Sequence, residues 1–397
     1  MRCVVYRYAV SLGVVTFYRT SRVYPVSNTK SAILRGIPYS LLSLLVGWWC
    51  FPWGFIRTIQ ALIVNFSGGE NITTQTKLDS QDPKLAKATH GYPNLERVRK
   101  SLKLLYKHFP NHTVYSFTKS ILPRDISIKS EEDPVIAAHR VAGAIVRHFN
   151  LPQGSILVNY RQSMEHPGRV ELTPENEYLV ELHTRYKEDP RDVAAILAHE
   201  ITHVFLYRAG LWLPNEYDNE ILTDTASTYL GVGWLGLNAF RVTESQQPSV
   251  NPGQVHIQWK EERLGYLTPE EFGYVLGKRA ITFQENMDGL ITSSAARKAF
   301  QKGFHKAKSE YRQPPLKKCS FAKRVLYWWN QKYIRKLNRT SGLKGLSRSF
   351  AEYQFDVSDE VKVVFECPVC SQKLRLPVKK NIQARCRVCQ SSFECKT

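Results

Sequence analysis

The chain has 397 residues, of which 43% are hydrophobic and 12% aromatic, so a disordered protein is excluded and two or three domains are expected. The formal net charge of +20 predicts an acidic partner such as anionic lipid or nucleic acid. Eight cysteines include two C-x-x-C pairs, a usage typical of metal sites in a reducing compartment and not of a disulfide-linked secreted protein.

The N-terminal third has two distinct parts. Residues 1–35 carry basic side chains and no acid, and we interpret them as a basic tail. Residues 36–66 are apolar apart from Arg57 and a few small polar residues, but Pro38 and the sequence FPWG divide them into pieces that are each too short to cross a bilayer core of about 30 Å. We therefore expect a membrane-associated hairpin, re-entrant or interfacial, with everything after residue 70 in the cytoplasm. A buried hairpin of a soluble protein is the alternative.

A polar stretch at 67–90 is typical of a linker, and residues 91–296 then show the patterns of a folded domain. Apolar residues at helical spacing predict helices over 95–109 and 133–151, and β-branched runs predict strands over 154–160 and 177–183. Strand 177–183 is our candidate for an edge strand that an extended peptide could extend. The order of helices and strands predicts an α+β domain.

The strongest motif lies on the next predicted helix. Asp189 is a suitable N-cap and Pro190 suits the first helical position. On this helix His199 and His203 are four residues apart, so both imidazoles lie on one face and can ligate a single Zn²⁺. Glu200 projects beside that metal, where a carboxylate can accept a proton from water. We interpret the motif as a catalytic zinc site, with a pair of ordinary core histidines as the alternative.

A catalytic zinc needs a third protein ligand. Glu220 and Asp224 are four residues apart on a following predicted helix. With Asn219 they match the Asn-Glu-x-x-x-Asp pattern that follows His-Glu-x-x-His in gluzincins, the class of zinc peptidases to which thermolysin belongs, and this chain resembles that class. The resemblance implies Glu220 as third ligand and Asp224 as the group that orients His199. The reverse roles, with Asp224 as ligand, are the alternative.

The region that carries this resemblance also looks like uncharacterised bacterial metallopeptidase-like proteins, over about residues 90 to 285. The resemblance implies a zincin-like fold and hydrolysis of a peptide or protein substrate. In that chemistry Glu200 acts as general base and then as general acid. A residue that stabilises the oxyanion is also expected, and the sequence does not rank the candidates Tyr217, Tyr229, His183 and Arg241.

Residues 297–360 predict a basic linker that contains a helix. Between Arg297 and Arg348 there are sixteen lysines and arginines and one acid, Glu310. Aromatic and basic residues interleave in this segment at Lys323, Arg324, Tyr327, Trp328, Trp329, Lys332, Tyr333, Arg335 and Lys336. Such a helix suits an anionic membrane surface or nucleic-acid phosphates. A solvated linker whose aromatic residues dock on the neighbouring domain is the alternative.

The last segment, 361–397, resembles a zinc ribbon. Cys367, Cys370, Cys386 and Cys389 have the spacing C-x₂-C-x₁₅-C-x₂-C, in which each pair forms a knuckle and four thiolates enclose a structural Zn²⁺. Strands are expected over 373–378 and 382–386. Cys395 is an alternative ligand just beyond the second knuckle.

The sequence therefore predicts an α+β protein with two zinc ions per chain, one catalytic and one structural. We expect a membrane-associated zinc metallopeptidase with an N-terminal hydrophobic hairpin and a small C-terminal zinc ribbon. Two other functions stay open at this point. One is a zinc-stabilised binding protein without turnover, and the other is a nucleic-acid-associated, protease-like factor that uses the basic linker and the ribbon.

Overall fold

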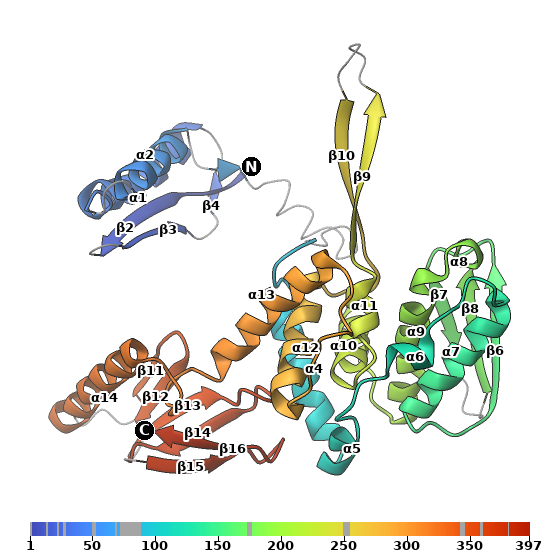
Figure 1. Ribbon diagram of the computed structural model, residues 1–397. Coiled ribbons are helices and arrows are strands. Elements are labelled where there is room, and N and C mark those ends of the chain that lie inside the picture. The colour runs from blue at the N-terminus through green and yellow to red at the C-terminus, as the bar shows by residue number, and fades with distance from the viewer. Residues whose placement is uncertain are drawn as a thin grey trace. The chain divides into compact units, whose positions relative to one another are not determined.

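The chain forms two compact units, Met1–Ala88 and Thr89–Thr397, in a computed structural model (Figure 1). The structure describes residues 2–12, 15–21, 24–26, 29–49, 53–67, 70–71, 89–172, 177–248, 255–341, 346–357, 360–379 and 381–397. Most of the expected linker at 67–90 lies outside these residues. The unit boundary falls inside that expected linker.

The first unit contains strands within the segment that we interpreted as a basic tail. Its elements are β1 (Arg2–Val5), β2 (Arg7–Leu12), β3 (Val15–Thr20), β4 (Tyr24–Val26), α1 (Thr29–Val46), α2 (Trp53–Phe66) and β5 (Glu70–Asn71). Strand β1 pairs with β4 and β5, and β2 pairs with β3, all antiparallel. Helices α1 and α2 contact each other and β2.

The apolar stretch divides between α1 and α2, as expected, but Pro38 does not divide it. Pro38 lies inside α1, because a proline within a helix removes only one backbone donor and neighbouring turns can maintain the helix. Among the described residues, no helix is long and apolar enough to cross a membrane.

The N-terminal part of the second unit is a small mixed sheet covered by helices. Its elements are α4 (Leu95–His108), α5 (Asn111–Ser116), α6 (Pro123–Ile126), α7 (Pro134–His148), β6 (Ser155–Arg161), β7 (Gly168–Glu171), β8 (Glu177–His183) and α8 (Arg185–Glu188). The two helices and two strands that we predicted here are confirmed as α4, α7, β6 and β8. Strand β8 lies in the centre, parallel to β6 and antiparallel to β7. Our edge-strand assignment of 177–183 is therefore wrong, and β7 is an edge.

Two successive helices carry the His-Glu-x-x-His and Asn-Glu-x-x-x-Asp motifs. They are α9 (Val193–Arg208), preceded by the 3₁₀ turn η1 (Pro190–Asp192), and α10 (Glu216–Tyr229). Asp189 accepts a hydrogen bond from the Arg191 amide, and Asn215 caps α10 by accepting from the Asp218 amide at 2.9 Å. Helix α9 contacts α7, α10, β7 and β8, so it lies buried between the sheet and α10.

A second helical layer follows. It contains α11 (Trp234–Asn238), the hairpin of β9 (Arg241–Pro248) and β10 (Val255–Glu262), α12 (Pro269–Phe283) and α13 (Ser294–Glu310). Thr268 and Glu271 form a reciprocal capping box at the start of α12. Helices α12 and α13 approach closely at glycines, because a Cβ on Gly303 would lie 2.1 Å from the Gly273 carbonyl carbon.

The C-terminal part combines one helix with small antiparallel sheets. It comprises α14 (Phe321–Ser341), β11 (Leu346–Ser349), β12 (Tyr353–Val357), β13 (Val361–Glu366), β14 (Lys373–Pro377), β15 (Asn381–Arg385) and β16 (Ser392–Lys396). Strands β11 to β14 form one sheet in chain order, and β15 pairs with β16. Tyr327 of α14 packs on Tyr353 and Phe355 of β12, whereas Trp328 and Trp329 are exposed.

Candidate metal centres

The first centre is formed where α9 and α10 face each other. His199 and His203 come from α9, one helical turn apart, and Glu220 comes from α10. His199 Nε2 lies 3.0 Å from His203 Nε2 and 3.0 Å from Glu220 Oε2, and His203 Nε2 lies 3.3 Å from the same carboxylate oxygen. Three donor atoms therefore converge on one point.

These separations fit a first-row metal ion. Zinc binds imidazole nitrogen and carboxylate oxygen at about 2.0–2.1 Å, so tetrahedral ligands lie about 3.3 Å from one another. The three measured separations, 3.0, 3.0 and 3.3 Å, are close to that value. The three side chains are 14–18% exposed, so the site is largely shielded but still in contact with solvent. The described residues of this centre could thus hold a zinc ion with one open position.

Behind the ligands, Asp224 and Thr223 contact the second nitrogen of each imidazole. Asp224 Oδ1 lies 2.8 Å from His199 Nδ1, and Thr223 Oγ1 lies 3.2 Å from His203 Nδ1. The other oxygen of Asp224 accepts from the amides of Tyr266 at 2.5 Å and Leu267 at 3.1 Å. Asp224 therefore engages the ring nitrogen of His199 that faces away from Glu220. Such contacts fix which imidazole nitrogen is free to bind metal.

The carboxyl groups of the site have different environments. Desolvation by burial raises the pKa of Glu200, against the opposing effect of His199 and His203. Burial also acts to raise the pKa of Glu220, but hydrogen bonds from the two histidines lower it well below its usual range. Glu220 is thus held in the ionised form that a metal ligand needs, whereas Glu200 is a carboxyl group suited to exchange protons.

Glu200 lies against the edge strand of the sheet. A Cβ on Gly168, the first residue of β7, would lie 3.1 Å from Glu200 Oε1 and only 2.4 Å from Ile196 Cγ2. The absence of a side chain at this position lets the strand approach α9 closely. His166, in the loop that leads to β7, is also near enough for its charge to favour the ionised form of Glu200.

The four oxyanion candidates have other partners in the structure. Tyr229 lies in the core with its hydroxyl 2.6 Å from that of Tyr106, Arg241 pairs with Asp192, His183 Nδ1 accepts from the Arg185 amide, and Tyr217 donates to Asn94. The ring of Tyr217 also lies 6.0 Å from that of Tyr266.

Sequence reasoning missed Tyr266. Its ring stacks on His199, with centroids 6.4 Å apart and planes at 18°. Burial and the neighbouring carboxylates Glu220 and Asp224 raise its pKa to about 12, so its hydroxyl keeps its proton at neutral pH. A signal for this turn was present in Gly265, whose φ of +82° lets the chain bring the next two amides to Asp224.

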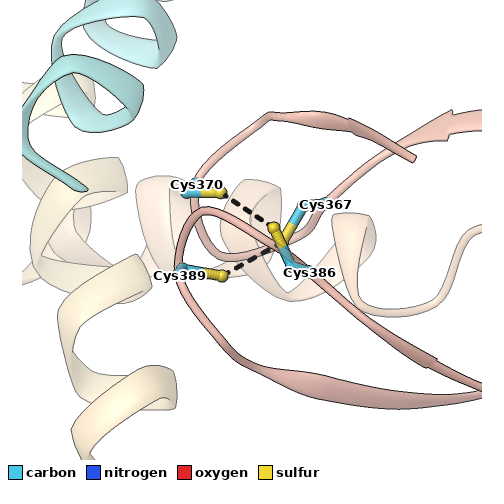
Figure 2. Close-up of side chains that lie close together, drawn as sticks. All are labelled: Cys367, Cys370, Cys386 and Cys389. Atoms are coloured by element: carbon cyan, nitrogen blue, oxygen red, sulfur yellow. Dashed lines mark hydrogen bonds between the residues drawn. The ribbon is translucent and has the colours of Figure 1, made fainter. Parts of the chain in front are cut away.

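The second centre is the cluster of four cysteines near the C-terminus. Cys367 Sγ lies 3.5 Å from Cys389 Sγ, and Cys370 Sγ lies 3.6 Å from Cys386 Sγ (Figure 2). Zinc–thiolate bonds of about 2.3 Å put tetrahedral sulfurs about 3.8 Å apart, whereas a disulfide needs about 2.05 Å. All four cysteines are buried. The cluster could therefore hold a fully enclosed metal ion.

Two equivalent knuckles present these thiols. The amide of Ser371 donates to the Cys367 carbonyl, and the amide of Gln390 donates to the Cys386 carbonyl, both at 2.9 Å. Ser371 and Gln390 have positive φ values of 56° and 61°, so each turn folds back on its first cysteine. The first knuckle joins β13 to β14 and the second joins β15 to β16, and the two strands predicted over 373–378 and 382–386 are confirmed as β14 and β15.

Cys395 does not belong to the cluster. It lies in β16, pairs in register with Ile382 and is buried, with its thiol directed toward the Phe393 carbonyl at 3.9 Å. Burial raises the pKa of its thiol to about 11. A neutral thiol in an apolar environment is a packing residue and not a metal ligand.

The two centres belong to one unit, and a buried lysine attaches the cysteine centre to the helices of that unit. Lys278 of α12 donates to the carbonyl of Pro368, inside the first knuckle. Its Nζ also lies 2.5 Å from Glu310 Oε2, and Glu310 pairs with Arg99 of α4 at 2.7 Å. The cysteine centre is thereby attached to the helices that support the histidine centre.

Comparisons with protein-family models, curated proteins and solved structures find no match to this chain.

Proposed function

We propose that this protein is a zinc-dependent metallopeptidase. The observation that carries the proposal is the convergence of His199, His203 and Glu220 on one point, beside a buried acid on the same helix. The contact of Asp224 with His199 supports the gluzincin assignment, because this class has an acid at that position of its second helix. The cysteine centre has a structural role, because it is fully enclosed.

The chemistry divides among the residues of the centre. A zinc ion held by the three ligands would polarise a peptide carbonyl and lower the pKa of water toward about 7. Glu200 accepts the proton from water and then delivers it to the leaving amine, a task for which its raised pKa is suited. Asp224 and Thr223 keep the imidazoles in the tautomer that leaves Nε2 free for the metal. Tyr266 keeps its proton and donates a hydrogen bond from its hydroxyl to the developing oxyanion.

The substrate binds along β7. Among the described residues this strand is an edge of its sheet, and it begins at Gly168, where a Cβ would lie 3.1 Å from Glu200 Oε1, so we place a peptide that pairs with β7 next to the general base. Strand β8 cannot take this role, because both its edges are already paired.

The test combines zinc content with peptidase activity on a mixture of quenched fluorescent peptides. We expect two zinc ions per wild-type chain, one for each donor group. His203→Ala should lose one zinc ion and all activity, whereas Glu200→Gln should keep both ions and lose activity by at least about 10²-fold. The double variant Cys386→Ser, Cys389→Ser serves as the matched control, because it should lose the other zinc ion. A zinc content of two ions per chain in the His203→Ala variant would overturn the proposal.

A further inference from the structure

Helices α1 and α2 of the first unit have the reverse polarity of a helical hairpin in water. The side chains that they direct into the unit are small or polar, and Ser40, Ser43, Thr58 and Asn65 are all buried. Most of the side chains that they direct outward are large and apolar, and Arg35 and Gln60 are also exposed. This outer face is defined by Leu34, Leu41, Leu45, Phe55, Ile63 and Phe66, which are 64, 52, 71, 47, 62 and 56% exposed.

Hydrogen bonds hold the inner face together with the buried side chains of Tyr6, Ala9 and Ala61. The Asn65 side chain bonds both the amide and the carbonyl of Arg7, at 2.9 and 2.8 Å. Ser43 Oγ accepts from the Ala9 amide at 3.0 Å, and Ser11 Oγ donates to the Gly47 carbonyl at 2.6 Å. In water the hydrophobic effect places leucine inside and serine outside. In lipid that driving force is absent, and helices associate through small residues and hydrogen bonds.

The outer face is wider than the apolar stripe that an amphipathic helix needs in order to dock on a single core. At 100° per residue, the exposed apolar positions of α1 from Leu34 to Leu45 cover about 160° of the helix, including Leu41, Leu42, Leu44 and Leu45 in one short run. An amphipathic helix that docks on a single core needs a stripe of about 100°. A fluid apolar solvent, unlike a groove, covers a wide and curved face completely.

The charge of this segment and the position of a tryptophan also favour a lipid bilayer as the surrounding medium. Residues 1–67 contain seven lysines and arginines and no aspartate or glutamate. Trp49, in the turn that follows α1, is 76% exposed, and tryptophan is enriched at the level of lipid headgroups. We propose that the outer face of α1 and α2 is embedded in a bilayer that contains anionic lipid, and that it anchors the chain there. This proposal is independent of the zinc chemistry of the second unit.

The first test is sedimentation of the full chain with vesicles. Vesicles of 30 mol% phosphatidylglycerol in phosphatidylcholine are compared with vesicles of phosphatidylcholine alone. We expect binding to both, and at least about tenfold tighter binding to the anionic vesicles at low salt, because basic residues near the surface add electrostatic attraction. A chain that sediments with neither vesicle would overturn the proposal.

A face variant identifies the surface. Leu41→Gln, Leu45→Gln, Ile63→Gln removes three apolar side chains from the outer face without touching the inner hydrogen bonds. We expect this variant to bind vesicles at least about thirtyfold more weakly, because each of the three substituted side chains no longer buries apolar surface in lipid. The matched control, Leu122→Gln, Ile136→Gln, Leu172→Gln, removes three exposed apolar side chains of the second unit and should bind vesicles as wild type does. Equal loss of binding in the control variant would contradict the assignment.

Quenching by lipid provides a readout that does not depend on the folding of the face variant. Vesicles with brominated acyl chains should quench part of the tryptophan fluorescence of the wild-type chain, and Trp49→Phe should abolish a measurable share of that quenching. Unchanged quenching in Trp49→Phe would place the hairpin outside the bilayer. Self-association of the wild-type chain that vesicles do not disperse, and that the face variant abolishes, would identify a second copy as the partner and overturn the lipid proposal.

Discussion

Asp224 uses both carboxylate oxygens, one for His199 and one for the amides that follow Gly265. Asparagine at this position keeps the shape but presents an NH₂ group to one of these partners, where a donor then meets a donor. We expect Asp224→Asn to lower zinc affinity by about 10- to 100-fold, measured by competition with a chelator. Asp218→Asn on the same helix, which loses only a pair with Arg97, should leave zinc affinity unchanged.

Gly168 allows β7 to approach Glu200. A methyl group there would overlap Ile196 and press on the carboxylate, so we expect Gly168→Ala to cost about 1–3 kcal/mol in the free energy of unfolding. Peptidase activity should fall while both zinc ions remain, because the three ligands are untouched. Gly143→Ala in α7 is the control, since its Cβ would meet only ordinary contacts at 3.4 Å or more. Comparable losses in the two variants would argue against a special role for Gly168.

At the scale of elements, Lys278 and Glu310 join α12, α13 and the first knuckle. Burial acts to raise the pKa of Glu310, but Lys278 and Arg99 lower it below its ordinary value. A lowered carboxyl pKa contributes stability above the unfolded value of about 4.5, and this contribution is lost as the pH falls through the lower folded value. The ion pair of Lys278 and Glu310 therefore stabilises the fold at neutral pH, and this stabilisation is lost in acid.

This pH dependence can be measured directly. We expect Glu310→Gln to cost about 3–5 kcal/mol at pH 7, because it leaves Lys278 buried without its counter-charge. The difference from wild type in urea unfolding should shrink as the pH falls below 4.5. Glu394→Gln, which breaks the exposed pair with Lys317, should show no measurable difference at either pH. A constant difference for Glu310→Gln across the acid range would contradict the assignment.

At the scale of the whole molecule, the two metal centres differ in access. The ligands of the histidine centre are 14–18% exposed, whereas the four cysteines are buried within two knuckles. A chelator such as phenanthroline should therefore remove the first zinc ion quickly with loss of activity and little change in near-ultraviolet circular dichroism. The zinc ion of the cysteine centre should leave slowly, together with unfolding of the C-terminal sheets, because a small zinc-binding domain depends on its metal for folding. Release of both ions in one step would show that the centres are not independent.

Local geometry explains which parts of this protein could be predicted from its sequence. The His199 and His203 pair, the cysteine knuckles and the predicted helices and strands all depend on residues a few positions apart, and helical or turn geometry fixes such residues relative to one another. Glu220 as third ligand was implied only by the resemblance to gluzincins, with Asp224 as the alternative, and the structure brings Glu220 to the two histidines. The mixed α+β character and a cysteine cluster able to hold zinc were determined at this level.

Only the tertiary structure decided the rest, because it depends on residues far apart in the chain. The position of β8 in the middle of its sheet, the close approach of β7 to Glu200 at Gly168 and the stacking of Tyr266 on His199 each arise from packing that no short pattern encodes. The same holds for the first unit. Its sequence predicts an apolar hairpin, but only the fold shows that serine and asparagine face inward while leucine and phenylalanine face outward. Side-chain direction is a property of the packed helices, whereas hydrophobicity is a property of the residues.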